Sequence, residues 1–362
     1  MSRSDDIRNI IEGDFGVPAP LDEEAMALVR KRLDSIAKPL DGLGDFEELL
    51  VRIGGITASD KLDIKKRAVV VMCADNGIVQ EGVSQTDSSV TRDVAYLMSE
   101  GRSSVGVMSR IAGCDTFPVN IGIKGEKIPG LIDMKIADGT ADFLKRAAMR
   151  FDDVFQAISA GIELVGTLKE RGYSMIATGE MGIGNTTTSA AIISAVLFKM
   201  PEEIVGRGAG LPDEGLLHKI NVVREALRFH ELDSGPRDII DILSLVGGLD
   251  IAGLTGVFVG GAVHRVPIVI DGLISATAAL VAANLMPESV DYMIASHIGN
   301  EPGMKYVYDE LKLKPVINAG LRLGEGTGAI MMFPLLDMAV ELYNNGVSFD
   351  DIKLKKYERY DV

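Results

Sequence analysis

The glycine-rich range 179–188 contains the side chains best suited to bind a phosphorylated ligand. It holds Glu180 together with Gly182, Gly184 and Asn185. Backbone N–H groups in such a turn, followed by a helix N-terminus, can bind a phosphate. No lysine follows the glycines as in a Walker A loop, and the full GxGxxG spacing of a dinucleotide fingerprint is absent. Tight turn geometry alone explains these glycines about as well as a ligand site does.

Two further glycine-rich segments add cations and a carboxylate. The turn around Gly208 includes Arg207 and precedes Lys219, and both cations are suited to charge-assisted hydrogen bonds with a phosphate. A helix cap with a surface lysine is the simpler alternative. In the range 323–328, Glu325 lies among glycines that let the backbone approach a ligand, which makes it a candidate general base. Most glutamates are solvated loop acids, so this motif alone does not establish catalysis.

Histidine, cysteine and serine patterns give no support for a metal centre or for covalent catalysis. The 4 histidines show no HExxH or other close ligand spacing, although His297 follows a predicted strand. Cys73 and Cys114 lie far apart without CxxC spacing and are interpreted as reduced core thiols. No GxSxG elbow is present. The sequence therefore favours direct displacement over acyl-enzyme chemistry.

These candidate residues follow short apolar runs that predict βαβ units and a parallel sheet. Each run is rich in β-branched residues, ends in polar or glycine residues and precedes a helical pattern. The runs are 68–72, 116–121, 174–177, 267–270, 292–295 and 315–317. Ligands of open parallel sheets bind beyond the carboxyl ends of the strands. We therefore expect Glu180, Asp271 and Ser296 to converge on one site.

The first 65 residues or so differ in character from the Gly- and Val-rich middle of the chain. Helical spacing of apolar residues predicts one helix over 23–33 and another over 46–53. Pro39, Gly42 and Gly44 mark a loop between them. This part of the chain is expected to form a small helical layer beside the sheet.

Composition narrows the class of partner to small molecules. The chain has 362 residues and a formal net charge of −15, with no basic run that would grip nucleic acid. The N-terminus carries acids where a signal peptide needs a basic segment, so a cytoplasmic protein is expected. The apolar runs are too short, or too polar, for the roughly 20 residues of a membrane helix.

Six segments, read together and in order, resemble the nicotinate-nucleotide:dimethylbenzimidazole phosphoribosyltransferase family. Each glycine motif alone is ambiguous, but the shared order and spacing make chance a poor explanation. The resemblance extends roughly from residue 30 to residue 345. The segments are ADNGIVQEGVS (74–84), GEMGIGNTTTSAA (179–191), VGRGAG (205–210), RVPIVIDGLISATAALVA (265–282), ASHIGNEPG (295–303) and LRLGEGTGA (321–329).

The resemblance implies a Rossmann-like α/β fold, with a parallel six-stranded sheet flanked by helices. It further implies a small helical domain from residues 1–65 and 335–362, a large catalytic domain from 66–334, and a homodimer. The implied reaction transfers phosphoribose from nicotinate mononucleotide to a lower-ligand base of a cobamide, giving an α-ribotide and nicotinate. The implied reaction needs neither a cofactor nor a metal.

Motif by motif, the resemblance assigns Glu325 as the general base and Glu180 as a ligand of the ribose. Lys219 and the glycine turns would hold the phosphate, with Ser296 nearby, and Asp271 would help to shape the site. The full substrate-binding set implied in this way is Glu180, Gly182, Gly184, Asn185, Gly208, Lys219, Asp271, Ser296, Ser84 and Gln85.

Departures from the family pattern leave alternatives open. The family commonly has His at Asn76, an aromatic residue and Pro at Gln85 and Thr86, and Ser and His at Gly299 and Met304. Because several of these lie near the implied base pocket, the acceptor could be another benzimidazole, a purine or a phenol. A partner-dependent subunit that pairs with a paralogue and a non-catalytic nucleotide-binding module are the rival interpretations. An NAD-dependent enzyme is disfavoured by the incomplete fingerprint.

Overall fold

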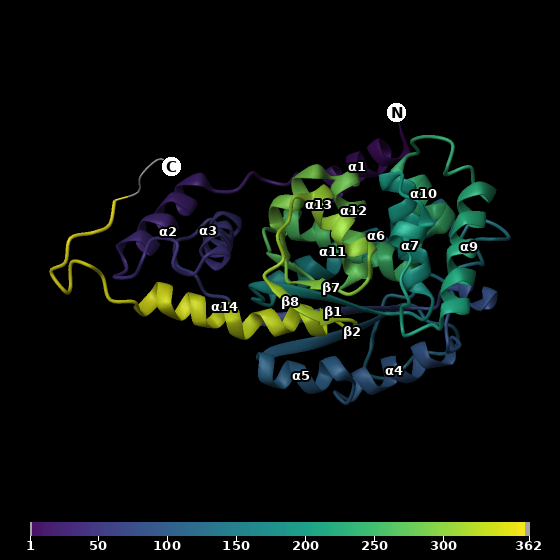
Figure 1. Cartoon of the computed structure of the whole chain (residues 1–362), viewed down its shortest axis with the longest axis horizontal. Coiled ribbons are helices and arrows are strands. Elements are labelled where there is room, and N and C mark those ends of the chain that lie inside the picture. Colours follow the sequence, from purple (N-terminus) through teal and green to yellow (C-terminus); the bar gives the residue numbers. More distant parts are fainter. Residues whose placement is uncertain (1, 359–362) are drawn as a thin grey trace.

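The computed structural model describes residues 2–358, and its centre is a six-stranded sheet (Figure 1). The strand order is β3-β2-β1-β4-β5-β6, and every neighbouring pair is parallel. The order reverses between β1 and β4, which is the switch point where open α/β sheets bind ligands. The strands are β1 Arg67–Ala74, β2 Cys114–Gly122, β3 Ile132–Asp133, β4 Met175–Met181, β5 Ile268–Ile270 and β6 Met293–Ala295.

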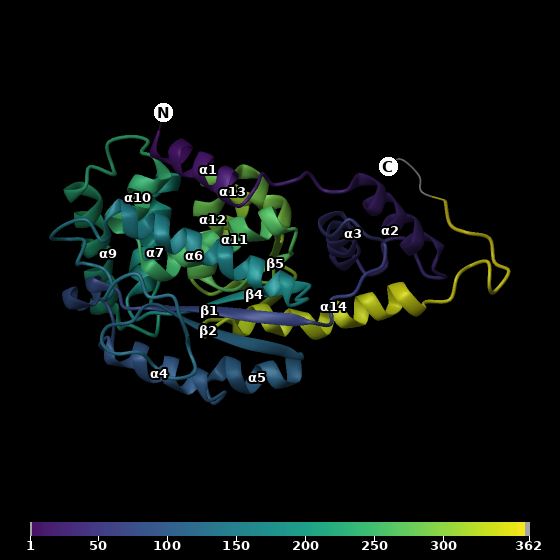
Figure 2. The ribbon, with the colours of Figure 1, turned by 180° about the vertical axis from the view of Figure 1, so that it is seen from behind.

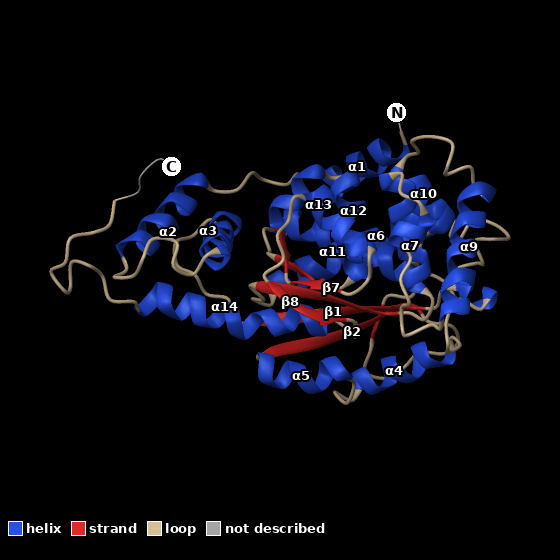
Figure 3. Ribbon diagram, viewed as in Figure 1, coloured by secondary structure: helices blue, strands red, loops and turns tan. Residues whose placement is uncertain are grey.

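Helices cover both faces of the sheet (Figures 1 and 3). The helices over one face are α6 Phe151–Glu170, α7 Asn185–Leu197, α10 Ile239–Val246, α11 Leu249–His264 and α12 Leu273–Leu285. The helices over the other face are α4 Ser89–Ser99, α5 Ser104–Ala112 and the N-terminal half of α14 Thr327–Asn345. The side chains of β1 alternate between the two faces of the sheet. Val70 and Met72 pack into the core beneath α6, α7, α10, α11 and α12, whereas Val71 and Cys73 pack into the core on the face covered by α14. The fully buried strands therefore read as continuous apolar runs.

The remaining elements border the sheet or its loops. The helices are α1 Arg3–Asp14, α8 Pro201–Ile204, α9 Asp213–Phe229 and α13 Gly303–Leu311, with 3₁₀ turns η1 Gly77–Glu81 and η2 Pro287–Tyr292. A second, two-stranded parallel sheet consists of β7 His297–Gly299 and β8 Ile317–Leu321. No helix within residues 2–358 is both long enough and apolar enough to cross a bilayer.

A helical lobe lies to one side of the sheet (Figures 1 and 2). It consists of α2 Glu23–Ser35 and α3 Asp45–Thr57, together with the C-terminal half of α14. Helix α1 instead packs on α10 and α12 of the large unit, and α14 continues through position 334 without a break. The division into 1–65 with 335–362 and 66–334 stays a prediction, and residues 359–362 lie outside the described residues.

The predicted α/β class and six-stranded parallel sheet are confirmed, but the sixth strand is a different one. Five of the predicted runs become β1, β2, β4, β5 and β6. The run 315–317 leads into β8, which pairs with β7 outside the main sheet. The sheet is completed at its edge by Ile132–Asp133, which pairs with Val119 and Asn120 of β2. Two residues are too few to give an alternation signal.

Candidate active site

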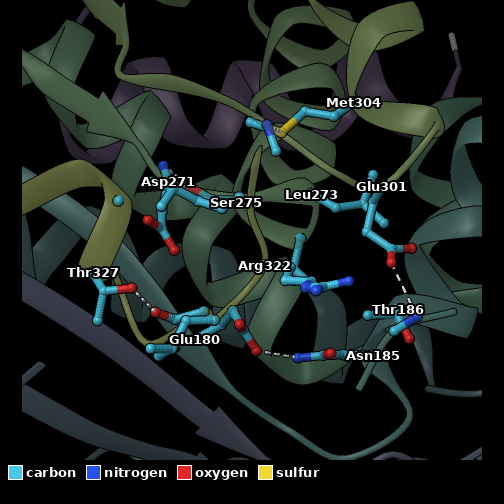
Figure 4. Close-up of a pocket in the computed structure, with 18 of the residues that line it drawn as sticks. Glu180, Asn185, Thr186, Asp271, Leu273, Ser275, Glu301, Met304, Arg322 and Thr327 are labelled. Atoms are coloured by element: carbon cyan, nitrogen blue, oxygen red, sulfur yellow. Dashed lines mark hydrogen bonds between the residues drawn. The ribbon is translucent and has the colours of Figure 1, made fainter. Parts of the chain in front are cut away.

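A pocket lies at the carboxyl ends of the strands, and five separate parts of the chain line it (Figure 4). These parts are the segment after β4, the glycine turn between α8 and α9, the segment after β5, the β7–α13 region and the loop between β8 and α14. The polar and charged residues among the lining are Glu180, Asn185, Thr186, Asp271, Ser275, His297, Asn300, Glu301, Arg322 and Thr327. Segments distant in sequence therefore meet at one site, as the strand pattern predicted.

One end of the pocket is suited to an anion. Lys219 of α9 is fully buried, and its ammonium donates to the Thr186 hydroxyl at 2.7 Å. The N–H of Gly208 donates to Glu301 Oε1 at 3.0 Å, whereas Glu301 Oε2 is buried and has no hydrogen-bond partner among residues 2–358. Burial lowers the pKa of Lys219 to about 8, and the charge of Glu301 opposes that shift. A phosphate dianion would place a further negative charge close to this buried ammonium.

The other end of the pocket is acidic. Glu180 is the penultimate residue of β4, and its Oε2 accepts from the Asn185 amide at the start of α7 (Figure 4). Burial raises the pKa of Glu180 to about 8, and the hydrogen bond from Asn185 opposes that shift. A Cβ on Gly324 would lie 2.7 Å from Glu180 Oε1, so only glycine leaves room for this carboxyl group. The loop before α14 thus packs directly on Glu180.

Glu325 occupies an unusual turn held by Asp271. Gly324, Glu325 and Gly326 all have positive φ angles, of 90°, 60° and 89°. A non-glycine residue in this left-handed region costs about 1 kcal/mol or more, and such residues concentrate at functional sites. Asp271 Oδ2 accepts from the Gly326 N–H at 3.1 Å, and its Oδ1 accepts from the Ala329 N–H at 2.9 Å. The buried carboxylate therefore caps α14 and fixes the turn that carries Glu325.

Comparison with known proteins identifies the family. A family model described as phosphoribosyltransferase matches residues 18–353. A Clostridium acetobutylicum protein named nicotinate-nucleotide–dimethylbenzimidazole phosphoribosyltransferase is 43% identical over 353 residues, covering 97% of this chain and 99% of that protein. The chain belongs to this phosphoribosyltransferase family. A protein of the same name from Chloroflexus aurantiacus is 38% identical over 343 residues, with 94% and 97% coverage.

A solved structure of a related protein also has the same fold as this chain. The crystal structure of CobT from Thermus thermophilus aligns with a TM-score of 0.86 and 33% sequence identity. The alignment covers 92% of this chain and 100% of that structure. The resemblance stated from the six sequence segments is therefore confirmed across nearly the whole chain.

The structure brings half of the predicted substrate-binding residues to the pocket surface and places the others around it. Those that line it are Glu180, Gly182, Asn185, Gly208 and Asp271. Gly184 is the N-cap of α7, and Lys219 lies beneath Gly208 and Thr186. The Ser296 hydroxyl is buried and donates to the Ile270 carbonyl at 2.5 Å, so it supports the strand end from behind. The roles of all these residues remain predictions.

Two predicted groups lie outside the pocket lining. The Gln85 amide donates to the Gly210 carbonyl, which ties the loop containing Ser84 to the glycine turn 205–210. Glu325 points toward the other layer, where its Oε2 accepts from the Val105 N–H of α5 at 3.0 Å. Its neighbours Gly324 and Thr327 line the pocket. Glu325 therefore lies at the margin of the site, on the turn whose adjacent residues line the pocket.

Several pocket residues carried no sequence signal of their own. Thr186, Glu301 and Arg322 are polar residues within recognised motifs, but nothing in their spacing distinguished them. His297, which follows a predicted strand, does line the pocket, and burial lowers its pKa. Among residues 2–358 no group of three or more His, Cys, Asp or Glu side chains could hold a metal ion.

The capping role of Asp271 gives a first prediction. Asp271→Asn leaves one oxygen for two N–H groups, so the free energy of unfolding should fall by about 1–3 kcal/mol. Because the turn of Glu325 loosens, kcat should also fall, with a smaller change in KM. Urea unfolding and steady-state kinetics measure the two effects. Asp22→Asn, which alters the cap of α2 far from the pocket, should leave kcat unchanged; a normal kcat for Asp271→Asn would contradict the assignment.

Proposed function

We propose that this chain transfers phosphoribose from nicotinate mononucleotide to 5,6-dimethylbenzimidazole or a related lower-ligand base, in cobamide nucleotide-loop synthesis. Family membership supports the reaction class, because relatives that match nearly the whole chain carry that name. The single structural observation that carries the proposal is a pocket with Glu180 at one end and, at the other, Thr186 and Gly208 lying over the buried Lys219. This polarity suits a donor with an anionic phosphate and a cationic ring.

The chemistry is a substitution at C1′ of the donor. A ring nitrogen of the acceptor, or the hydroxyl oxygen of a phenol, forms the new bond to C1′, and the bond from C1′ to the pyridinium nitrogen breaks. Its electron pair leaves with nicotinate, which neutralises the ring, and the acceptor gives up one proton. The enzyme must align the acceptor, hold the phosphate and accept that proton. In this proposal Glu325 is the acceptor of the proton.

Each end of the donor has a candidate partner. The N–H of Gly208, the hydroxyl of Thr186 and the ammonium of Lys219 would hold the phosphate. Glu301 would then have to give up the Gly208 N–H that it now accepts. Arg322 projects between Glu180 and Glu301 and makes no ion pair with any described residue, so its guanidinium can pair with the nicotinate carboxylate (Figure 4).

The acceptor end contains the departures from the family pattern. The Gly299 N–H donates to Met304 Sδ at 3.0 Å, so these two departures contact each other at the pocket wall. A thioether and a glycine there give an adaptable apolar wall in place of two polar side chains. We therefore propose that donor chemistry is retained while the range of acceptors differs from that of dimethylbenzimidazole specialists.

The test is release of nicotinate from nicotinate mononucleotide with 5,6-dimethylbenzimidazole, adenine and p-cresol, with each product identified by mass. Acceptor-dependent release is the expected result, with turnover of adenine or p-cresol comparable to that of dimethylbenzimidazole. A clear preference for dimethylbenzimidazole would refute the altered acceptor range and leave the reaction intact. Absence of release with every acceptor would refute the reaction, and recovery on adding a paralogue would favour a partner-dependent subunit.

We also infer that the chain acts in the cytoplasm as a homodimer. Relatives that match nearly the whole chain are named as transferases acting on a nucleotide, a small metabolite, which supports the location. Met331 and Met338 of α14 are 41% and 62% exposed, which gives an apolar strip that a second copy would cover. A heterodimer with a paralogue would use the same strip.

A further inference from the structure

Two buried carboxylates share one amide behind the acidic end of the pocket. The Asn185 side-chain nitrogen donates to Glu180 Oε2 and, at 3.0 Å, to Asp250 Oδ2. Asp250 lies in the first turn of α11 and is completely inaccessible to solvent. An amide NH₂ group has two hydrogens, so both are used. The Asn185 orientation is therefore fixed from behind by Asp250 and from the front by Glu180.

The surroundings of Asp250 hold its carboxylate in place. Its Oδ1 accepts from the Ile251 N–H at 3.0 Å, at the N-terminus of α11. A Cβ on Gly182 would lie 2.8 Å from Asp250 Oδ2 and 2.8 Å from the Asn76 amide nitrogen, so the β4–α7 turn rests directly on this cluster. The cluster lies where β1 and β4 end, at the switch point of the sheet.

We propose that Asp250 is a positioning residue for the transfer reaction, which acts through Asn185 to aim Glu180 into the pocket and to favour a cationic ring there. Asp250 is not part of the pocket lining, so it does not touch the ligand itself. The inference rests on the proposed function, because the pyridinium ring of nicotinate mononucleotide is the cation that Glu180 would face. Neither carboxylate forms an ion pair with a Lys, Arg or His among residues 2–358. The donor would supply the missing positive charge.

The electrostatics of the cluster agree with that role. Burial raises the pKa of Glu180 to about 8, and the charges of Asp250, Asp271 and Glu325 raise it further, whereas Asn185 opposes them. Burial also raises the pKa of Asp250 to about 6. The thiol of Cys73 on β1 stays neutral, since burial raises its pKa and the charges of Glu180 and Asp250 raise it further. A cationic ring favours ionised Glu180, so kcat/KM should rise with pH up to about 8.

The test compares the pH profiles of two variants that act on Glu180 in opposite directions. Asp250→Asn keeps the shape and removes the charge that raises the pKa of Glu180, so the acid limb of kcat/KM should move down by about one pH unit. Asn185→Leu removes the hydrogen bond that lowers this pKa, so its acid limb should move up. In both variants kcat should fall at least about 10-fold, because Glu180 loses its fixed orientation. General damage to the fold would not shift the acid limbs of kcat/KM in opposite directions in the two variants.

Asp238→Asn is the matched control, and the infrared band of the Glu180 carboxyl is a readout that does not depend on turnover. Asp238→Asn alters an aspartate that caps α10, away from the pocket, and should leave the profile in place. Asp250→Ser replaces Asp250→Asn if the latter does not fold. The infrared band of the protonated Glu180 carboxyl, assigned by its loss in Glu180→Gln, should titrate at lower pH in the Asp250 variant. An unchanged titration would overturn the inference. Absence of nicotinate release by the wild type would overturn only the proposed function.

Discussion

Glu325→Gln should lower kcat for nicotinate release by about 10²- to 10⁴-fold, because a general base contributes roughly this factor. Glutamine keeps the size of the side chain and an oxygen that can accept from the Val105 N–H. It cannot take the proton that the acceptor loses when its ring nitrogen bonds to C1′. Single-turnover kinetics with a saturating acceptor measure the chemical step.

Binding of the donor should survive the same change. Glu325 lies outside the pocket lining, so the dissociation constant of nicotinate mononucleotide should change by less than about threefold, since its contacts stay in place. Glu341→Gln alters an exposed glutamate further along α14 and should behave as the wild type. If Glu325→Gln keeps more than about a tenth of the wild-type kcat, below the usual contribution of a general base, Glu325 is not that base. Tight donor binding without turnover in the wild type would favour the nucleotide-binding module.

The turn of Glu325 shows why part of the site could be predicted from sequence. Glycines on both sides of an acid require a backbone that few other residues adopt, and the structure has positive φ at all three positions. The same reasoning located the β4–α7 turn, although α7 begins at Asn185, inside the glycine-rich range 179–188 and not after it. Local signals of this kind survive because the turn chemistry is contained in a few adjacent residues.

Asp250 shows why the rest of the site could not be predicted. In the sequence it is one acid at the start of an apolar helical stretch, a position where acids commonly complement the helix dipole. Its contact with Asn185, 65 residues away in the chain, exists only once α11 and α7 pack on the same face of the sheet. Glu301 is similar, because its partner Gly208 is 93 residues away. Contacts that form only through tertiary packing cannot be recognised from the spacing of residues in the sequence.

Lys219→Met should raise the KM for nicotinate mononucleotide by about 10- to 100-fold, since a charge-assisted hydrogen bond contributes about 1.5–3 kcal/mol. Methionine fills the buried space but offers neither charge nor donor to the phosphate. The kcat at saturating donor should change much less, because Lys219 lies at the end of the pocket away from Glu180 and the turn of Glu325. Lys305→Met removes an exposed lysine of α13 and should leave KM unchanged.

The pH dependence of KM separates a phosphate ligand from a structural lysine. The pKa of Lys219 is lowered to about 8, so the ammonium is charged below this pH and loses its proton above it. The KM of the wild type should therefore rise as the pH increases through about 8, whereas Lys219→Met should start high and lack this rise. The bound phosphate would hold the proton on Lys219, so kcat should not share the alkaline loss. If the KM of Lys219→Met still rises as the pH increases through about 8, the titrating group is a different residue, and Lys219 does not bind the phosphate.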